Sequence, residues 1–167
     1  APKSNLVGKE GDGFKIAMQG LDGGRINIAS CSLGAARFCI ERSISYVNER
    51  KQFGKFLKDF QSIQFKLADM ITDFETAKLI VHKAANALDK NERNSTAMSA
   101  MAKRYATDVC FKICNEALQI HGGYGYLADF GIEKMVRDCR VHQILEGTNE
   151  IMRVIISRKL LERDSDG

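Results

Sequence analysis

A single carboxylate, Glu146, lies in a sequence setting that suits acid–base chemistry on carbon. It follows the apolar pair Ile144 and Leu145 and precedes Gly147, just before a helix that is expected to begin near Thr148. An apolar setting disfavours the charged form of a carboxylate, which suits a general base that acts on a weak carbon acid. Alternatively, Glu146 only stabilises the positive end of the last helix, with Thr148 as its N-cap. The spacing alone favours this second interpretation.

A glycine-rich segment follows the third expected helix. It reads QIHGGYGY from Gln119 to Tyr126, with three glycines in four residues. Backbone amides that carry no neighbouring side chains could approach a phosphate or a ring closely. The alternative is a glycine that ends the helix and an irregular turn after it, and the segment taken alone favours this alternative.

A basic connection is the third segment that could hold a ligand. It reads ERKQFG from Glu49 to Gly54, and Phe60 and Gln61 follow it. The guanidinium fork of Arg50 could clamp a diphosphate, with Phe53 as an apolar wall beside it. A solvated basic loop explains the same residues equally well.

Long helices must position these three segments. Apolar residues recur at helical spacing over residues 25–48 and 62–90, and a third run extends from the capping candidates Asn94 and Ser95 to a stop at His121. A short helix is expected over 131–139, a loop over 141–147 and a last helix over 148–163. Because helices this long bury their apolar faces only side by side, we expect an all-α, up-down bundle of the four-helix type.

Composition agrees with one helical domain. The chain has 167 residues, a single proline and no tryptophan, which favours long uninterrupted helices over many short strands. Residues 1–20 are expected to form a lead-in segment, 21–163 the bundle domain and 164–167 a tail. The opening at Ala1 carries no initiating Met, signal peptide or transit peptide, as expected for the middle of a longer protein or a trimmed chain.

Charge and cysteine content exclude several classes of function. Basic residues are scattered rather than clustered, so no nucleic-acid partner is expected. No apolar run approaches the roughly 20 residues that span a bilayer, so a soluble protein without a membrane span is expected. The five cysteines lack a CxxC pair, which indicates a reducing compartment. Cys110 and Cys114 share a helix face, but without ligand partners nearby we expect buried packing and no metal.

Taken together, the three segments resemble the acyl-CoA dehydrogenase family, and the likeness extends from about Gly11 to Arg163. Four stretches carry it: LDGGR ending at Arg25, RKQFG at Arg50–Gly54, QIHGGYGY at Gln119–Tyr126 and RDCRVHQILEGTNEI at Arg137–Ile151. Their combination, order and separation are far more specific than any one stretch, so the resemblance reverses the separate interpretations given above.

The resemblance implies the carboxy-terminal helical domain of an enzyme that dehydrogenates an acyl-CoA at its α,β-bond with FAD. Glu146 matches the general base, and its backbone amide would polarise the thioester carbonyl. Two branches of the family instead carry the base at the position of Gly24, where a glycine cannot serve, and neither can Gly23. The segments HQILEGTNE and GGRINIASCSLGAA resemble most those of isobutyryl-CoA or short branched-chain dehydrogenases.

The resemblance also implies ligand contacts. One group of residues would contact FAD that is bound mainly by a neighbouring subunit, largely at its adenosine diphosphate half: Arg50, Gln52, Phe53, Gln61, Gln119, Gly122 and Gly123. Thr148 and Glu150 would contact the flavin of the chain's own site. The substrate would lie near Asp22, Arg25, Gly147 and Arg158.

Further expectations follow from the same resemblance. They are a homo-oligomer, either a dimer or a tetramer, with electron-transfer flavoprotein as partner and the mitochondrial matrix as location. The family's amino-terminal helical and middle β-domains are missing from this chain, so by itself it is expected to bind FAD weakly or not at all and to complete no turnover. The alternatives are a non-catalytic helical oligomerisation module and an acyl-CoA oxidase.

Overall fold

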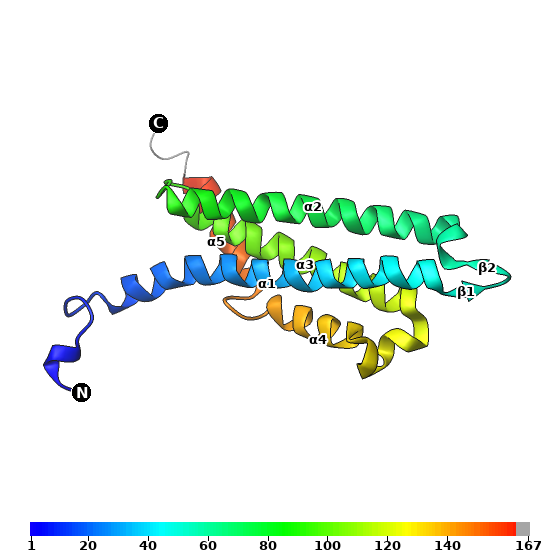
Figure 1. Ribbon diagram of the computed structural model, residues 1–167. Coiled ribbons are helices and arrows are strands. Elements are labelled where there is room, and N and C mark those ends of the chain that lie inside the picture. Colours follow the sequence, from blue (N-terminus) through cyan, green and yellow to red (C-terminus); the bar gives the residue numbers. More distant parts are fainter. Residues whose placement is uncertain (163–167) are drawn as a thin grey trace.

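Three long helices lie side by side and form the body of the protein (Figure 1). The computed structural model describes residues 1–162, and within them five α-helices account for most of the chain. Their bounds are α1 (Gly13–Glu49), α2 (Gln61–Asp89), α3 (Ser95–His121), α4 (Ile132–His142) and α5 (Asn149–Leu161). Helix α3 packs against α1, α2, α4 and α5. The predicted all-α bundle is confirmed.

Helix α1 begins much earlier than the sequence pattern predicts. The pattern placed its start near Arg25 with Gly23 and Gly24 as the entry, but the helix already begins at Gly13. Glycine keeps its backbone donor and acceptor, so it weakens a helix by about 0.5–1 kcal/mol relative to alanine without ending it. Residues 13–20, part of the predicted lead-in segment, are therefore exposed helix that projects beyond the bundle (Figure 1).

Two apolar clusters fill the bundle, and α3 contributes to both. One joins α1, α2, α3 and α4 around Ile40, Phe74 and Ile113, and the other joins α1, α2 and α3 around Ala29, Val81 and Ala102. Cys110 and Cys114 are fully buried in the first cluster, where the Sγ atoms of Cys114 and Cys139 lie 3.7 Å apart. The predicted buried packing of Cys110 and Cys114 is confirmed.

The basic connection after α1 is a small antiparallel hairpin that the sequence pattern does not predict. Strands β1 (Lys51–Gln52) and β2 (Lys55–Phe56) pair Lys51 with Phe56, and Phe53 and Gly54 form the turn with φ of 53° and 81°. Two consecutive positive φ values are typical of the tight hairpin turn that matches strand twist. Strands of two residues are too short to show an alternating pattern.

The other boundaries lie close to prediction, with one exception. Helix α3 ends at His121, with Gly122 at φ 58° as its cap, and a 3₁₀ turn, η3 (Gly122–Tyr126), follows. Helix α4 extends to His142, so the predicted loop start at Val141 is wrong and the loop spans 143–148. The predicted tail 164–167 and the predicted helix end at Arg163 lie outside the described residues. No helix within residues 1–162 is long and apolar enough to cross a membrane.

Candidate active site

The loop that carries Glu146 adopts an uncommon backbone conformation. Glu146 has φ 55° and Gly147 has φ 91°, so two successive residues lie in the left-handed region. A residue other than glycine pays strain energy there, and such strain persists only where the surroundings fix the backbone. A side chain at position 147 would be strained at this φ, and its Cβ would lie 2.8 Å from Cε of Met152, which would have to shift. The loop between α4 and α5 thus has a specific backbone conformation that its surroundings hold in place.

The carboxylate of Glu146 lies directly against Gly24 of α1. A Cβ built on Gly24 would meet Oε2 of Glu146 at 2.5 Å and its Cδ at 3.1 Å. Glu146 is half-buried. The two positions at which the family's base is expected, Gly24 and Glu146, are therefore neighbours in space although they are 122 positions apart in the sequence. Glycine at position 24 leaves the room that the Glu146 side chain occupies.

Thr148 caps helix α5, as the sequence predicts. Its hydroxyl oxygen accepts a hydrogen bond from the backbone N–H of Ile151 at 3.4 Å. The alternative in which Glu146 serves only the positive end of α5 does not account for its position, because its carboxylate contacts α1. Glu150 is exposed in the first turn of α5.

A buried lysine lies beneath the loop and is absent from the residues that the sequence predicts for the site. Lys103 of α3 is 0% exposed, and its ammonium group donates to the carbonyl of Gly147 and to Oδ1 of Asn149, both at 2.8 Å. Burial is the main cause that lowers the pKa of Lys103 from 10.5 to about 8, while Asp108 opposes the shift. A sequence signal existed, since Lys103 interrupts the buried stripe of Ser99, Ala106 and Cys110.

Asn149, at the start of α5, ties the loop to α3 through a polar network. Its amide nitrogen donates to Oδ1 of Asp108 at 2.7 Å and to the hydroxyl of Thr107 at 2.9 Å. Gln143, at the other end of the loop, donates to the same oxygen of Asp108 at 2.7 Å. The backbone carbonyl of Gln143 accepts a hydrogen bond from the N–H of Asn149 at 3.0 Å. Both ends of the loop are thus fastened to one carboxylate.

His142 fastens the end of α4 to α1. Its Nδ1 lies 2.8 Å from the hydroxyl of Ser32, and that hydroxyl also donates to the carbonyl of Ile28 at 3.0 Å. Burial is the main cause that lowers the pKa of His142. A neutral ring that donates to Ser32 satisfies both contacts, because the hydroxyl has a single proton.

Two of the predicted substrate residues form a largely buried ion pair in the same turn of α1 as Gly24. NH1 of Arg25 lies 2.7 Å from Oδ1 of Asp22, whose other oxygen accepts from the hydroxyl of Thr96 at 2.6 Å. Arg25 is 7% exposed, and its buried Nε has no partner. Asp22 and Arg25 therefore lie in the part of α1 against which the Glu146 carboxylate is placed. Arg158 is exposed in the last turns of α5 and lies outside this cluster.

The residues predicted to contact the adenosine diphosphate half of FAD gather at the hairpin end of the bundle. A pocket of about 430 Å³ is lined there by several of them, namely Arg50, Gln52, Gly122 and Gly123. Tyr46 and His121 stack in this pocket with ring centroids 4.3 Å apart, and the guanidinium of Arg50 lies 5.3 Å from the centre of the Tyr124 ring. Neither tyrosine is among the residues that the sequence predicts.

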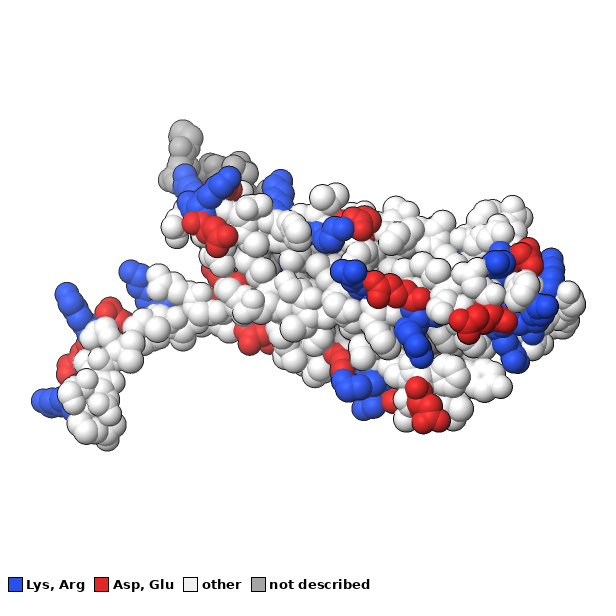
Figure 2. Space-filling model, viewed as in Figure 1, with Lys and Arg blue, Asp and Glu red and all other residues white. Residues whose placement is uncertain are grey.

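Three further predicted residues lie near this pocket but do not line it. Phe53 is at the hairpin tip and 92% exposed, Gln61 begins α2, and Gln119 lies in the last turn of α3. A φ of 53° makes Phe53 a strained residue that presents an apolar ring to its surroundings. Figure 2 shows Lys and Arg side chains at this end of the molecule, and elsewhere on the face shown charges of both signs are interspersed.

The two groups of predicted cofactor contacts are far apart. Along α1 the 26 residues from Gly24 to Arg50 correspond to about 39 Å at about 1.5 Å per residue. Figure 1 shows the hairpin at one end of the bundle and the loop before α5 toward the other. One chain therefore presents two separate surfaces, one around Glu146 and one around Arg50.

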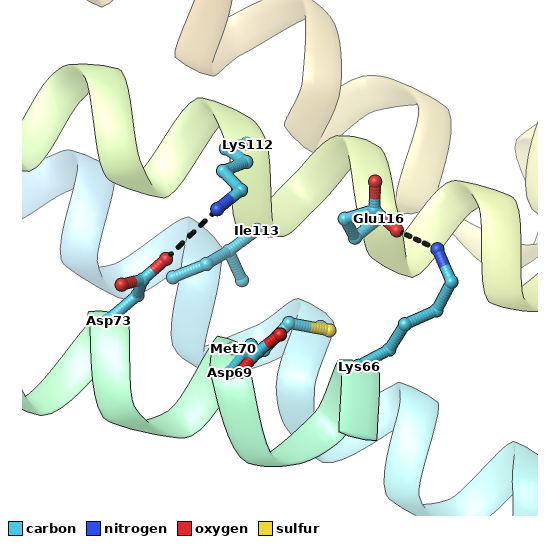
Figure 3. Close-up of a pocket in the computed structure, with 7 residues that line it drawn as sticks. All are labelled: Lys66, Asp69, Met70, Asp73, Lys112, Ile113 and Glu116. Atoms are coloured by element: carbon cyan, nitrogen blue, oxygen red, sulfur yellow. Dashed lines mark hydrogen bonds and ion pairs between the residues drawn. The ribbon is translucent and has the colours of Figure 1, made fainter. Parts of the chain in front are cut away.

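A further pocket, of about 230 Å³, lies between α2 and α3 and contains no predicted site residue (Figure 3). Met70 and Ile113 supply its apolar surface. Lys112 and Asp73 form an ion pair across it at 3.4 Å, and Lys66 pairs with Glu116. Its charges are thus largely paired between the two helices, and it lies apart from the loop of Glu146.

Comparison with known proteins decides the family. The family model described as "Acyl-CoA dehydrogenase, C-terminal domain" matches residues 11–161. The chain belongs to the acyl-CoA dehydrogenase family. This acyl-CoA dehydrogenase domain is 54% identical over 161 residues to the mitochondrial isobutyryl-CoA dehydrogenase of Bos taurus, and the match covers 96% of this chain and 39% of that protein. It is 48% identical over 162 residues to the caffeyl-CoA reductase–Etf complex subunit CarC of Acetobacterium woodii, covering 97% and 42%.

Solved acyl-CoA dehydrogenase structures have the same fold. The butyryl-CoA dehydrogenase of Megasphaera elsdenii superimposes with a TM-score of 0.93 at 45% identity, covering 96% of this chain and 42% of that one. The Bacillus anthracis acyl-CoA dehydrogenase, solved in complex with FAD, superimposes with a TM-score of 0.92 at 32% identity, covering 98% and 31%. This acyl-CoA dehydrogenase domain thus spans about two fifths of the curated relatives that it matches.

Proposed function

We propose that this chain is the carboxy-terminal domain of an FAD-dependent acyl-CoA dehydrogenase in which Glu146 is the general base. The observation that carries the proposal is the position of the Glu146 carboxylate, which a strained loop holds against Gly24 of α1. No side chain at position 24 competes for that space. The ion pair of Asp22 and Arg25, two residues whose family resemblance implies a place near the substrate, lies in the same turn of α1.

The proposed reaction is proton abstraction from a thioester. The carboxylate of Glu146 removes the proton at the α-carbon of the acyl group, and the backbone N–H of Glu146 donates to the thioester carbonyl oxygen, where negative charge develops. Bound FAD would accept the hydride that leaves the β-carbon. The fixed loop supports this division of roles, because base and amide belong to one residue and are placed together.

The substrate that we propose is a short, possibly branched acyl-CoA of the isobutyryl-CoA type. The 54% identity with isobutyryl-CoA dehydrogenase supports this choice. Relatives named for butyryl-CoA and caffeyl-CoA are 45% and 48% identical. Similar identities are thus shared with enzymes named for different acyl groups, and the choice of isobutyryl-CoA follows the higher identity.

FAD fits the two surfaces if they serve two cofactor molecules. Thr148 and Glu150 lie beside Glu146, whereas Arg50, Gln52, Gly122 and Gly123 line a pocket about 39 Å away along α1. A guanidinium beside exposed glycine backbone suits a diphosphate. The exposed ring of Phe53 suits contact with another chain. We therefore propose a homo-oligomer, a dimer or tetramer, in which the hairpin end contacts FAD of a neighbouring subunit.

The proposed electron acceptor is electron-transfer flavoprotein, and the proposed location is the mitochondrial matrix. A relative that is named as subunit of an Etf complex supports the partner, and the mitochondrial isobutyryl-CoA dehydrogenase supports the location. Turnover with this acceptor should exceed turnover with oxygen. The reverse result would identify an acyl-CoA oxidase.

The test of the base is Glu146→Gln in the full-length flavoprotein. Reduction of the flavin by isobutyryl-CoA should slow by about 10²- to 10⁴-fold, the range for loss of a general base. Bound FAD should stay at the wild-type level, as measured by its absorbance per subunit. The matched control is Glu133→Gln on α4, a carboxylate that pairs with Arg137 of the same helix, and this change should leave the rate unchanged. A Glu146→Gln protein that still reduces its flavin at the wild-type rate would refute the proposal and favour a non-catalytic bundle.

A further inference from the structure

We propose that Lys103 is a positioning residue whose buried ammonium group fixes the loop that presents Glu146. This inference rests on the function proposed above. It goes beyond the base itself, because Lys103 acts through the backbone of the loop and not on the substrate.

Burial makes Lys103 unusual. Its side chain is 0% exposed, on the face of α3 that packs inside the bundle. Lysine is almost never fully buried without specific partners, because an ammonium group loses its hydration there. The two direct acceptors, Gly147 O and Asn149 Oδ1, are both uncharged oxygens. A buried charge whose direct acceptors are uncharged is costly for folding, so the two bonds to the loop and to the start of α5 are the feature that requires explanation.

The two oxygens that accept from Lys103 belong to residues close in sequence to the proposed base, Glu146. Gly147 follows Glu146 directly, and both residues have positive φ. The bond from Lys103 to the Gly147 carbonyl orients the peptide at the end of the strained segment, and the bond to Asn149 holds the first residue of α5. Because α3 packs against both α1 and α5, Lys103 links the loop to the helix that carries Gly24. The carboxylate is thereby held at a fixed position over α1.

The surrounding charges favour a protonated Lys103 near neutral pH. Asp108 of α3, Glu146 of the loop and Glu150 of α5 attract the ammonium group, while Arg25 of α1 repels it. Asp108 is itself shared among Gln143, Asn149 and, at 3.8 Å each, Arg104 and Arg153. The ammonium group therefore donates to Gly147 and Asn149, while Asp108, the carboxylate that attracts it most, is engaged by these other groups. A neutral side chain of equal length would leave both loop acceptors without their donor.

The test is Lys103→Met in the full-length flavoprotein, compared with Lys112→Met. Both lysines belong to α3, but Lys112 is exposed and pairs with Asp73 on α2. For Lys103→Met, kcat per bound flavin should fall by about 10- to 100-fold, since a base displaced by about 1 Å loses about that much rate. KM for isobutyryl-CoA and the FAD content should stay within about threefold of wild type. Lys112→Met should change neither kcat nor KM.

A second measurement reads the loop without turnover. In hydrogen–deuterium exchange, the amides of residues 144–148 should exchange faster in Lys103→Met than in wild type or Lys112→Met. If Lys103→Met does not fold, Asn149→Ala takes its place, because it removes one of the two acceptors. It should show the same faster exchange and a smaller loss of kcat.

Three results would overturn the inference. The first is a kcat of Lys103→Met within twofold of Lys112→Met. The second is a loss that resides in KM or in FAD content. The third is unchanged exchange at residues 144–148 in the variant tested. Glu146→Gln separates the two proposals: if it is inactive while Lys103→Met is normal, only the role of Lys103 fails, and if it is fully active, the proposed function fails.

Discussion

Replacing Gly24 by alanine should make the protein more stable and less active. Gly24 lies in the interior of α1, and the methyl group that the substitution adds would meet Oε2 of Glu146 at 2.5 Å. Ordinary contacts of a Cβ begin at about 3.4 Å. The carboxylate must therefore move by about 0.9 Å, the difference between these two distances. It is the far end of a flexible side chain, so the movement costs little stability.

The gain in stability and the loss of activity expected for Gly24→Ala can be estimated separately. Alanine in a helix interior is more stable than glycine by about 0.5–1 kcal/mol. A displacement of about 1 Å at a catalytic group costs up to about 10²-fold in rate. Gly23→Ala is the matched control, because it gains the same helix propensity and a Cβ there meets no atom within 4 Å. Only the Gly24 variant should lose activity.

The assay measures flavin reduction by isobutyryl-CoA and thermal unfolding in the same preparations of full-length protein. Both variants should unfold at or above the wild-type temperature, and Gly24→Ala should reduce its flavin about 10- to 100-fold more slowly than Gly23→Ala. Equal rates for the two variants would refute the reasoning, because the Glu146 carboxylate would then have no defined position over α1. A large loss of stability in Gly24→Ala alone would show that the loop, and not only the side chain, had to move.

Two further predictions concern Lys103 and Arg50. The folded-state pKa of Lys103, about 8, lies below its ordinary value of 10.5, so between these pH values the unfolded state binds the proton more tightly and the unfolding free energy rises with pH. Denaturant unfolding at pH 7, 8.5 and 10 should show wild type gaining up to about 3 kcal/mol relative to Lys103→Met across that window; parallel pH curves for the two proteins would contradict a buried ammonium group. Arg50→Ala should weaken FAD binding about tenfold while kcat per bound flavin stays at the wild-type value, as measured by flavin titration of the apoprotein. Lys58→Ala, on the same hairpin end but outside the pocket, is its control, and a loss of kcat per flavin in Arg50→Ala would assign Arg50 another role.

The helical architecture could be predicted from local patterns. Each long helix repeats an apolar stripe at its own period, and that stripe must be buried wherever the helix packs. A glycine stop ends α3 after His121, and the Thr148 hydroxyl caps the start of α5. Neither α2 nor α3 has a side-chain capping bond at its start, so the capping candidates Asn94 and Ser95 mark the start of α3 by position only. The start of α1 was mispredicted because a glycine pair weakens a helix without ending it, and only the exposed projection of residues 13–20 shows that the helix continues.

The site itself could be predicted only in part. The sequence identifies Glu146 and the segments around Arg50 and Gly122 through their resemblance to a family, and the family match over residues 11–161 confirms that resemblance. The sequence pattern also shows a lysine within the buried stripe of α3, which is a signal for Lys103. It gives no partner for that lysine, because Gly147 lies 44 residues away.

The sequence by itself determined the helices, their approximate ends and the family, because these follow from periodicity, caps and motifs within short stretches of chain. Tertiary structure alone decided that Glu146 lies against Gly24, that Lys103 donates to the carbonyl of Gly147 in the loop of Glu146, and that the two predicted cofactor surfaces are separate. The physical reason is that each of these facts is a contact or a distance between distant parts of the chain. Such contacts exist only once α1, α3 and α5 have packed together and fixed the loop backbone in a conformation that it would not adopt alone.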